Sequence, residues 1–179
     1  MPKSKAEKSP AAPWQVPVAI DDIAETGRHF DLVADAGARS AVARMAGLRD
    51  LPRFEARFDV NRRGAGGLHV AGVVSATVGQ NCVVTLEPLA NEVEEAIDLV
   101  FVPQRTPAPQ DGETELPDVK WGDPEPLIDG IVDLGALATE FLILGLDPYP
   151  RKPDAVFEPP QIATPDAGPF AALAKLAKT

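Results

Sequence analysis

Cysteine is almost absent from this sequence, since Cys82 is the only one in 179 residues. A single thiol cannot form an internal disulfide, which is typical of the reducing cytosol. Structural zinc needs four thiolate or imidazole ligands, usually from Cys-x-x-Cys pairs, and the position three after Cys82 is Thr85. The two histidines, His29 and His69, are far apart in the sequence. We therefore predict no metal and no cofactor, and interpret Cys82 as a small buried thiol in a strand.

Several other signals are also missing. The opening residues, MPKSKAEKSP, have no apolar region of the kind found in a signal peptide, and no apolar run is long enough to span a membrane. The sequence has no glycine loop for phosphate and no nucleophile elbow. These absences predict a cytoplasmic protein that is not an enzyme and has no small-molecule substrate.

Carboxylates and prolines are in excess. The net charge is −10, and an acidic surface repels phosphate backbones. Nineteen prolines indicate long loops. We expect a disordered tail over residues 1–12, one domain over 13–150, and a proline-rich linker with a short amphipathic helix over 151–179, the helix being Pro169–Leu176. The proline-rich segments 103–126 and 148–167 should be irregular, with Trp121 able to dock on the sheet.

The clearest helix begins after Asp133 and ends near Leu146. Asp133 is a good N-cap, and Gly145 and Pro148 stop the helix. Thr139 and Glu140 are expected on its wet side. The expected apolar face consists of Leu134, Leu137, Ala138, Phe141, Leu142 and Leu144.

The rest of the domain is predicted to be one helix and several strands. Asp35 should cap a helix that ends at Leu48, with an apolar stripe of Ala38, Val42, Met45 and Leu48. Strands are expected over residues 14–20 (an edge strand broken by Pro17), 28–33, 52–60, 68–78, 81–87 and 93–102. The predicted fold is α+β: an antiparallel sheet or partial barrel of about four to six strands packed against one long core helix.

The basic residues gather between residues 39 and 63. We select Arg53, Arg57, Arg62 and Arg63 as candidate contacts for RNA or a partner, because arginine suits bidentate phosphate contact. The competing interpretation is a solvated strand face with local ion pairs. The segment 14–67 is neutral in sum, whereas the remainder of the domain is strongly negative, so the chain is polarised.

Three stretches of the sequence form a recognisable set of motifs. The first carries Gly72, Ala76, Gln80, Cys82, Leu86 and Pro88. The second is Gly130-Ile131-Val132-Asp133-Leu134, and the third is Pro169–Leu176. Together they resemble the YceD-like family of large ribosomal RNA subunit accumulation proteins.

The resemblance implies a bacterial cytoplasmic protein needed for accumulation of 23S ribosomal RNA. Its partner would be a ribosomal RNA precursor or a ribosomal protein. The alternative is an acidic protein-interaction module that binds a basic partner without touching RNA. Many members have Cys-x-x-Cys at the positions of Cys82 and Thr85 and more cysteines after the leucine-rich helix. Residues 147–153 contain none, so zinc, if bound elsewhere in the family, cannot be bound that way here.

Overall fold

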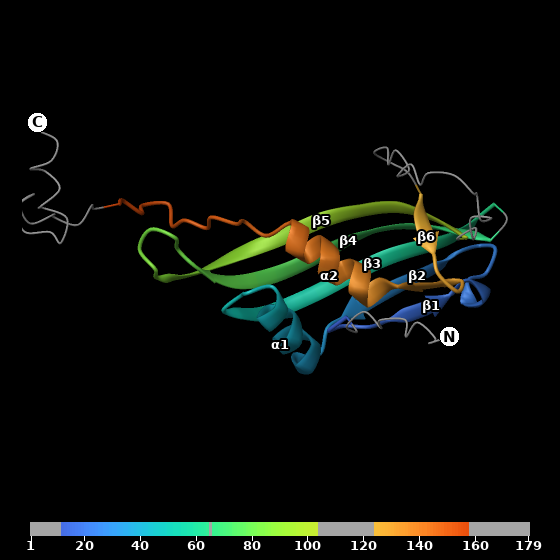
Figure 1. Ribbon diagram of the computed structural model, residues 1–179, viewed down its shortest axis with the longest axis horizontal. Helices are drawn as coiled ribbons and strands as arrows, with labels where there is room; N and C mark the ends of the chain where they lie inside the picture. The colour runs from blue at the N-terminus through green and yellow to red at the C-terminus, as the bar shows by residue number, and fades with distance from the viewer. Residues whose placement is uncertain (1–11, 65, 104–123, 158–179) are drawn as a thin grey trace, which may run out of the picture.

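The computed structural model describes residues 12–64, 66–103 and 124–157. Within them the chain forms a five-stranded sheet, a two-stranded sheet and two short α-helices (Figure 1). The elements in order are β1 (Pro17–Ala19), the 3-10 turn η1 (Ile20–Asp22), β2 (Arg28–Val33), α1 (Ala36–Met45), β3 (Asp50–Arg63), β4 (Gly67–Asn81), β5 (Pro88–Pro103), β6 (Glu125–Leu127), β7 (Ile131–Asp133) and α2 (Leu134–Leu144).

The main sheet has five strands in the order β2-β3-β4-β5-β6. Its first three pairings are antiparallel and the β5–β6 pairing is parallel. β1 and β7 form a separate antiparallel pair. The predicted combination of helices with a mostly antiparallel sheet is therefore confirmed in part: the sheet is open and not a closed barrel, and the predicted long core helix is the short α2.

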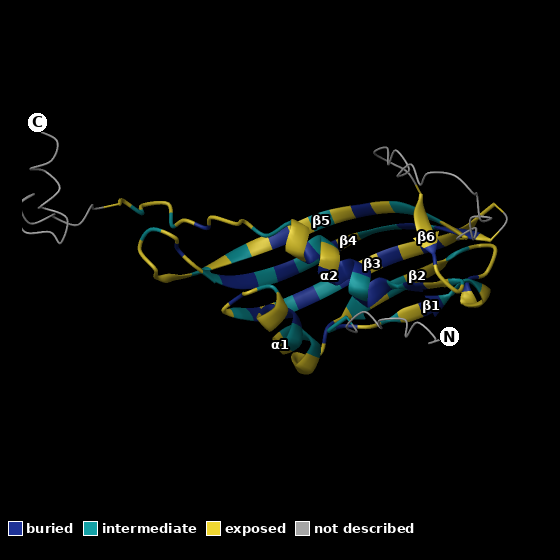
Figure 2. Ribbon diagram, in the orientation of Figure 1, coloured by how far each residue is buried: buried dark blue, intermediate teal, exposed yellow. Residues whose placement is uncertain are grey.

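Strict alternation gives the main sheet one covered face and one open face. Phe54, Phe58, Val60, Val70 and Val74 all lie on the covered face and are almost fully buried. This face packs against α1, α2 and the β1–β7 pair in one continuous core (Figures 1 and 2). Trp14 completes the core with an edge-on contact to Phe54, their ring centroids 4.7 Å apart. The opposite face has no covering element within the described residues.

The predicted strand over residues 81–87 is wrong. β4 runs on to Asn81, and the chain then turns back so that Pro88 begins β5 opposite Asn81. Leu86 has a φ of +60°, which a strand cannot hold. The turn is closed by two backbone bonds, Leu86 N–H to Cys82 O and Cys82 N–H to Glu87 O. The β-forming residues of this stretch predict a strand, because the sequence pattern carries no signal for the two local hydrogen bonds that close the turn.

α2 follows the prediction in its core and departs from it at two positions. Leu134, Leu137, Ala138 and Leu142 are buried as expected. Thr139, expected in water, is only 3% exposed, and its hydroxyl donates to the carbonyl of Gly135 at 2.8 Å. That internal bond is what permits a hydroxyl to be buried. Leu144, expected in the core, is 71% exposed in the last turn.

α1 lies beside the first half of β3. The Asp35 carboxylate accepts from Ala38 N–H at 2.7 Å, so the predicted cap is confirmed. Val42 and Leu48 are buried, but Met45 is 54% exposed, which corrects the predicted stripe. Ala43 takes its place, because the helix presents a neighbouring row of side chains to the sheet.

Several predictions lie wholly or mostly outside the described residues. These are the tail over 1–12, Trp121 with most of the segment 103–126, the end of the segment 148–167, and the helix Pro169–Leu176. Of the second segment, residues 148–157 are described and contain no helix or strand. Residues 125–127, at the end of the first, form β6. No helix in the described ranges is long and apolar enough to cross a membrane.

The contrast between Leu142 and Leu144 gives a direct test of the core. Leu142→Ala should lower the free energy of unfolding by about 2–5 kcal/mol, because it removes a fully buried side chain. Leu144→Ala, in the same helix turn, should change it by no more than about 0.5 kcal/mol. Urea unfolding followed by circular dichroism measures both values. Equal costs for the two substitutions would show that α2 does not pack through Leu142.

Candidate functional site

The face of the sheet away from the helices, here called the open face, is covered by polar side chains. It consists of His29, Asp31 and Val33 on β2; Arg53, Glu55, Arg57 and Asp59 on β3; His69, Ala71, Val73, Ser75 and Thr77 on β4; and Glu92, Glu94, Ala96 and Asp98 on β5. A hollow of about 590 Å³ lies over its β2–β3–β4 part.

Arg53 is held in place by its neighbours on the open face. Its guanidinium donates to Ser75 Oγ at 2.9 Å, to Thr77 Oγ1 at 3.3 Å and to Glu92 Oε2 at 2.6 Å. The Thr77 hydroxyl and the Arg53 guanidinium together lower the pKa of Glu92. Arg53 therefore has few donors left for a partner.

Arg57 belongs to a chain of alternating charges. Its Nε lies 3.4 Å from Asp31, which in turn lies 3.4 Å from His29, and His29 pairs with Asp59 at 2.8 Å. The hydrogen bond with Asp59 is the main cause that raises the pKa of His29. Arg57 is mostly exposed, so this pair is worth at most about 1 kcal/mol.

The open face is negative in sum. It carries six carboxylates (Asp31, Glu55, Asp59, Glu92, Glu94 and Asp98) against the two guanidinium groups of Arg53 and Arg57. A phosphate approaching either arginine meets carboxylates on the neighbouring strands. The geometry therefore favours local ion pairing over phosphate contact for these two arginines.

Of the other two candidate arginines, Arg62 is not part of this group, and Arg63 continues the alternation of Arg53 and Arg57 at the end of β3. Arg62 lies on the side of the sheet that carries Phe58 and Val60, and donates to the carbonyls of Ile23 and Ile20 at 2.6 and 2.9 Å. These two hydrogen bonds hold η1 and the following residue Ile23 against the end of β3. Arg63 is exposed at the end of β3 beside the hairpin turn. The structure thus brings Arg53 and Arg57 onto one face and separates Arg62 from them.

The motif residues Cys82, Leu86 and Pro88 build the β4–β5 turn. The Cys82 side chain is fully buried, and its sulfur accepts from Thr85 N–H at 3.4 Å. The Thr85 side chain and the backbone N–H groups of Lys152, Thr85 and Val84 lower the pKa of the Cys82 thiol to about 6, overcoming the opposing effect of burial. The sequence identified a buried thiol correctly, but it lies in a turn and not in a strand.

The segment after α2 closes over this turn. Val83 N–H donates to the carbonyl of Pro150 at 2.9 Å, and Lys152 pairs with Glu87 at 2.7 Å. The motif residue Gln80 adds a bond from its amide to the carbonyl of Asp147 at 3.0 Å. We call the turn 82–87 together with residues 147–152 the knuckle. The knuckle joins two segments that are about 65 positions apart in the sequence.

The knuckle holds the positions at which the resemblance implies further cysteines, and its residues do not suit zinc. Thr85 stands at the second cysteine position, and residues 147–153 offer neither cysteine nor histidine. The described residues contain no group of three or more His, Cys, Asp or Glu side chains able to hold a metal. Hydrogen bonds and the Lys152–Glu87 ion pair join the two segments here.

The remaining motif residues are structural. Gly72 faces Phe58 across β3 and β4, where an added Cβ would lie 2.8 Å from the Phe58 ring. Asp133 Oδ1 accepts from Gly135 and Ala136 N–H, each at 3.0 Å, and from Val16 N–H at 2.8 Å. It therefore caps α2 and holds the N-terminal segment at once. Leu134 follows it into the core.

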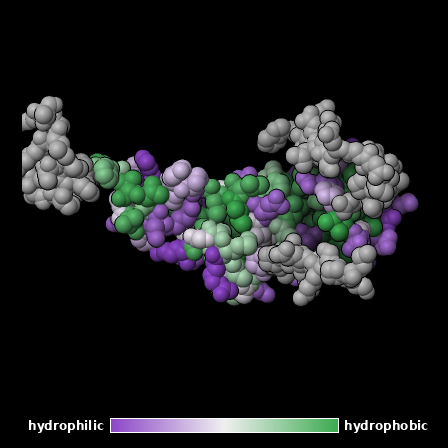
Figure 3. Space-filling model, in the orientation of Figure 1, coloured by the Kyte–Doolittle hydropathy of each residue, from purple (hydrophilic) through white to green (hydrophobic). Residues whose placement is uncertain are grey.

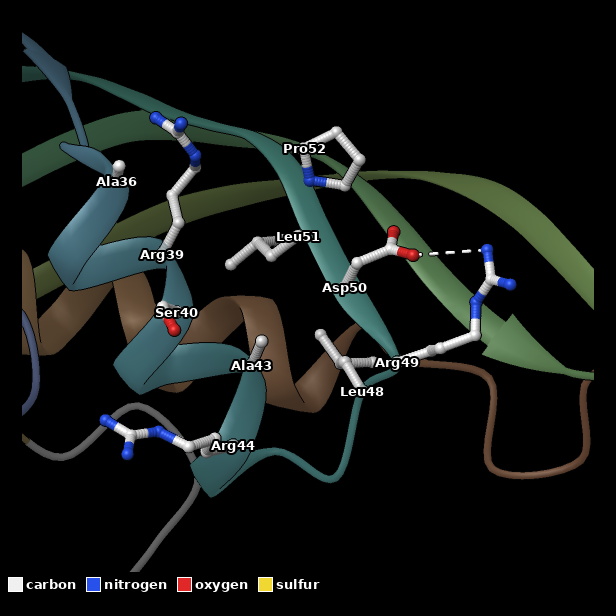
Figure 4. Close-up of a pocket in the computed structure, with 10 residues that line it drawn as sticks. All are labelled: Ala36, Arg39, Ser40, Ala43, Arg44, Leu48, Arg49, Asp50, Leu51 and Pro52. Carbon is white, nitrogen blue, oxygen red and sulfur yellow. Dashed lines mark ion pairs between the residues drawn. The ribbon is translucent and has the colours of Figure 1, made fainter.

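A second hollow, which the sequence did not single out, lies between α1 and the start of β3 (Figure 4). Arg39 and Arg44 from α1 and Arg49 from the following connection stand around it. Sequence reasoning placed these residues in the basic run but could not place them around one cavity. Their spacing of five residues gave no helical or strand period that would signal a shared site.

The comparisons with known proteins agree with the motif residues. A family model described as "Large ribosomal RNA subunit accumulation protein YceD" matches residues 70–177, more than half of the chain. No curated protein and no solved structure matches the chain.

Replacing Asp133 should be costly, because one carboxylate oxygen serves three backbone donors. Asp133→Ala should lower the free energy of unfolding by about 2 kcal/mol, from the lost cap and the unpaired Val16 N–H. Asp133→Asn keeps an acceptor and should cost less. Asp35→Ala is the matched control, since the α1 cap accepts a single exposed bond. Urea titrations that gave equal losses for Asp133→Ala and Asp35→Ala would contradict this role.

The lowered pKa of Cys82 predicts a pH-dependent stability. The folded-state pKa of about 6 lies below the ordinary thiol value of 9.0, so between these values the unfolded chain holds more protons. The thiolate's contribution should be absent below pH 6, grow as the pH rises, and be complete above pH 9. Unfolding free energies of wild type and Cys82→Ser, measured from pH 6 to pH 9, should therefore diverge. A constant difference would show that the thiol stays protonated.

Proposed function

Because the chain belongs to the YceD family of large ribosomal RNA subunit accumulation proteins, we propose that it is a non-enzymatic factor that promotes accumulation of 23S ribosomal RNA. It would act in the cytoplasm during biogenesis of the large ribosomal subunit. The family match carries this proposal. It covers β4, β5, α2 and the knuckle, which are the elements that the motif residues build.

The protein can reach ribosomal RNA directly or through a ribosomal protein. The negative charge of the open face favours contact of this surface with a ribosomal protein. Ribosomal proteins that bind RNA are basic, and the open face presents six carboxylates, of which Glu55, Asp59 and Glu94 line its hollow. An acidic module that binds a basic ribosomal protein is therefore the second candidate function. It differs from the first in that no residue of this chain touches RNA.

The function is tested in cells that lack the native copy. The full chain should restore the ratio of 23S to 16S ribosomal RNA and should sediment with large-subunit precursors in a sucrose gradient. Failure of both would overturn the proposed function.

The same assay with Glu94→Lys/Asp98→Lys separates the two routes. Both carboxylates are exposed on β5, so the fold should tolerate the change. Loss of co-sedimentation and of RNA accumulation would support binding of a basic ribosomal protein by the open face. Full activity would show that the open face is not the working surface. The melting temperature of the variant confirms that it remains folded.

A further inference from the structure

The hollow beside α1, here called the arginine pocket, differs in charge from the open face. Its volume is about 340 Å³, and it is lined by residues from α1, the following connection and the start of β3. Three of its lining residues are arginines and one, Asp50, is a carboxylate, so the pocket has a net charge of +2. The whole chain has a net charge of −10. The pocket is therefore a local positive site on an acidic protein.

The guanidinium groups around the pocket are only partly used within the protein. One guanidinium nitrogen of Arg39 donates to the carbonyl of Ala34 at 2.6 Å. This bond orients the guanidinium and leaves its other N–H groups available. Arg49 lies 3.1 Å from Asp50 in a pair that is about half exposed. Arg44 is exposed and makes no ion pair within the described ranges. Figure 4 shows the three groups at three separate corners of the cavity.

Between these corners the floor is apolar. Ala43, Leu48 and Leu51 are buried there, with Pro52 at one edge and the Ser40 hydroxyl at the other. An anion alone would use the rim and leave this floor empty. A ligand that combines negative groups with a flat apolar body would use both. A ribonucleotide has this combination, and a volume near the lower end of small-ligand pockets, about 300–1,000 Å³, suits one nucleotide and not several.

We propose that the arginine pocket binds single-stranded ribosomal RNA, one nucleotide seated on the apolar floor and the adjoining phosphates on Arg44 and Arg49. Arginine gives planar, bidentate donors to phosphate, and bases stack on guanidinium planes or sit between apolar side chains. The hydrogen bond from Arg39 to the carbonyl of Ala34 holds the Arg39 guanidinium at the edge of the pocket. This inference rests on the proposed function and supplies its RNA contact, which the negative open face is unsuited to provide.

The test measures binding of a fluorescently labelled twelve-residue oligouridylate by the full-length protein. Arg44→Gln/Arg49→Gln should weaken binding at least tenfold at low salt. It should also reduce the slope of log K against log salt concentration by about 1.4, since each phosphate contact on a single strand contributes about 0.7. Arg44→Lys/Arg49→Lys keeps the charge and should keep most of the slope. Arg53→Gln/Arg57→Gln on the open face removes the same charge and should leave binding unchanged.

Two results would overturn the inference: absence of oligonucleotide binding by the wild-type protein, or equal losses in the two glutamine variants. Because Arg44 and Arg49 are exposed, we expect unchanged melting temperatures. If the double variant melts early, the single variant Arg44→Gln replaces it, and photo-crosslinking of the wild type to 4-thiouridine RNA must place the adducts within residues 36–52.

The proposed function and the arginine pocket can fail separately. If the chain restores 23S ribosomal RNA in cells but binds no oligonucleotide, the function stands and the pocket is refuted. If it binds the oligonucleotide through the pocket but restores nothing, the pocket stands and the cellular role is refuted. Restoration by wild type and by Arg53→Gln/Arg57→Gln, but not by Arg44→Gln/Arg49→Gln, would support both.

Discussion

The side chain of Asp133 joins three elements that pack on the covered face: the N-terminal segment before β1, β7 and α2. Its Oδ1 accepts from the first turn of α2 and from Val16, just before β1, while its backbone is the last residue of β7. The carboxylate therefore fixes where α2 begins and where the N-terminal segment lies. Trp14, two residues before Val16, then packs edge-on against Phe54 in the core of the sheet. Without this oxygen, the start of α2 and the segment that carries Trp14 and β1 are no longer held by one shared hydrogen-bond acceptor.

Features that depend on neighbouring residues could be read from the sequence. β2 was predicted with the bounds that the structure has, and the capping roles of Asp35 and Asp133 follow from where polar side chains precede apolar periods. The alternation around Phe54 and Phe58 located the covered face of β3, because a strand that buries one face must keep its period. The motif residues of the knuckle were recognised in the sequence, but the sequence did not predict that the turn 82–87 contacts residues 147–152.

Features that depend on distant residues could not be read in this way. Thr139 is buried where α2 packs against the sheet, with its hydroxyl bonded to the carbonyl of Gly135, whereas Leu144 in the last turn of α2 is exposed. Arg62 carries the same charge as Arg53, yet it donates to the backbone carbonyls of Ile20 in η1 and of Ile23 just after it, about 40 positions earlier. The arginine pocket depends in the same way on how α1 meets β3, which no period in the sequence describes.

The pairing of β1 with β7 sets an order of events during folding. Val16 and Asp133 are 117 positions apart, whereas β3, β4 and β5 are joined by short turns. Local hairpins close quickly, and contacts between distant positions form only after the loop-closure entropy has been met. On the ribosome, the central strands can assemble while the chain is still being made. β1 has no strand partner until residue 133 has left the exit tunnel, so the strand that is synthesised first can pair only after the strands of the main sheet have been made.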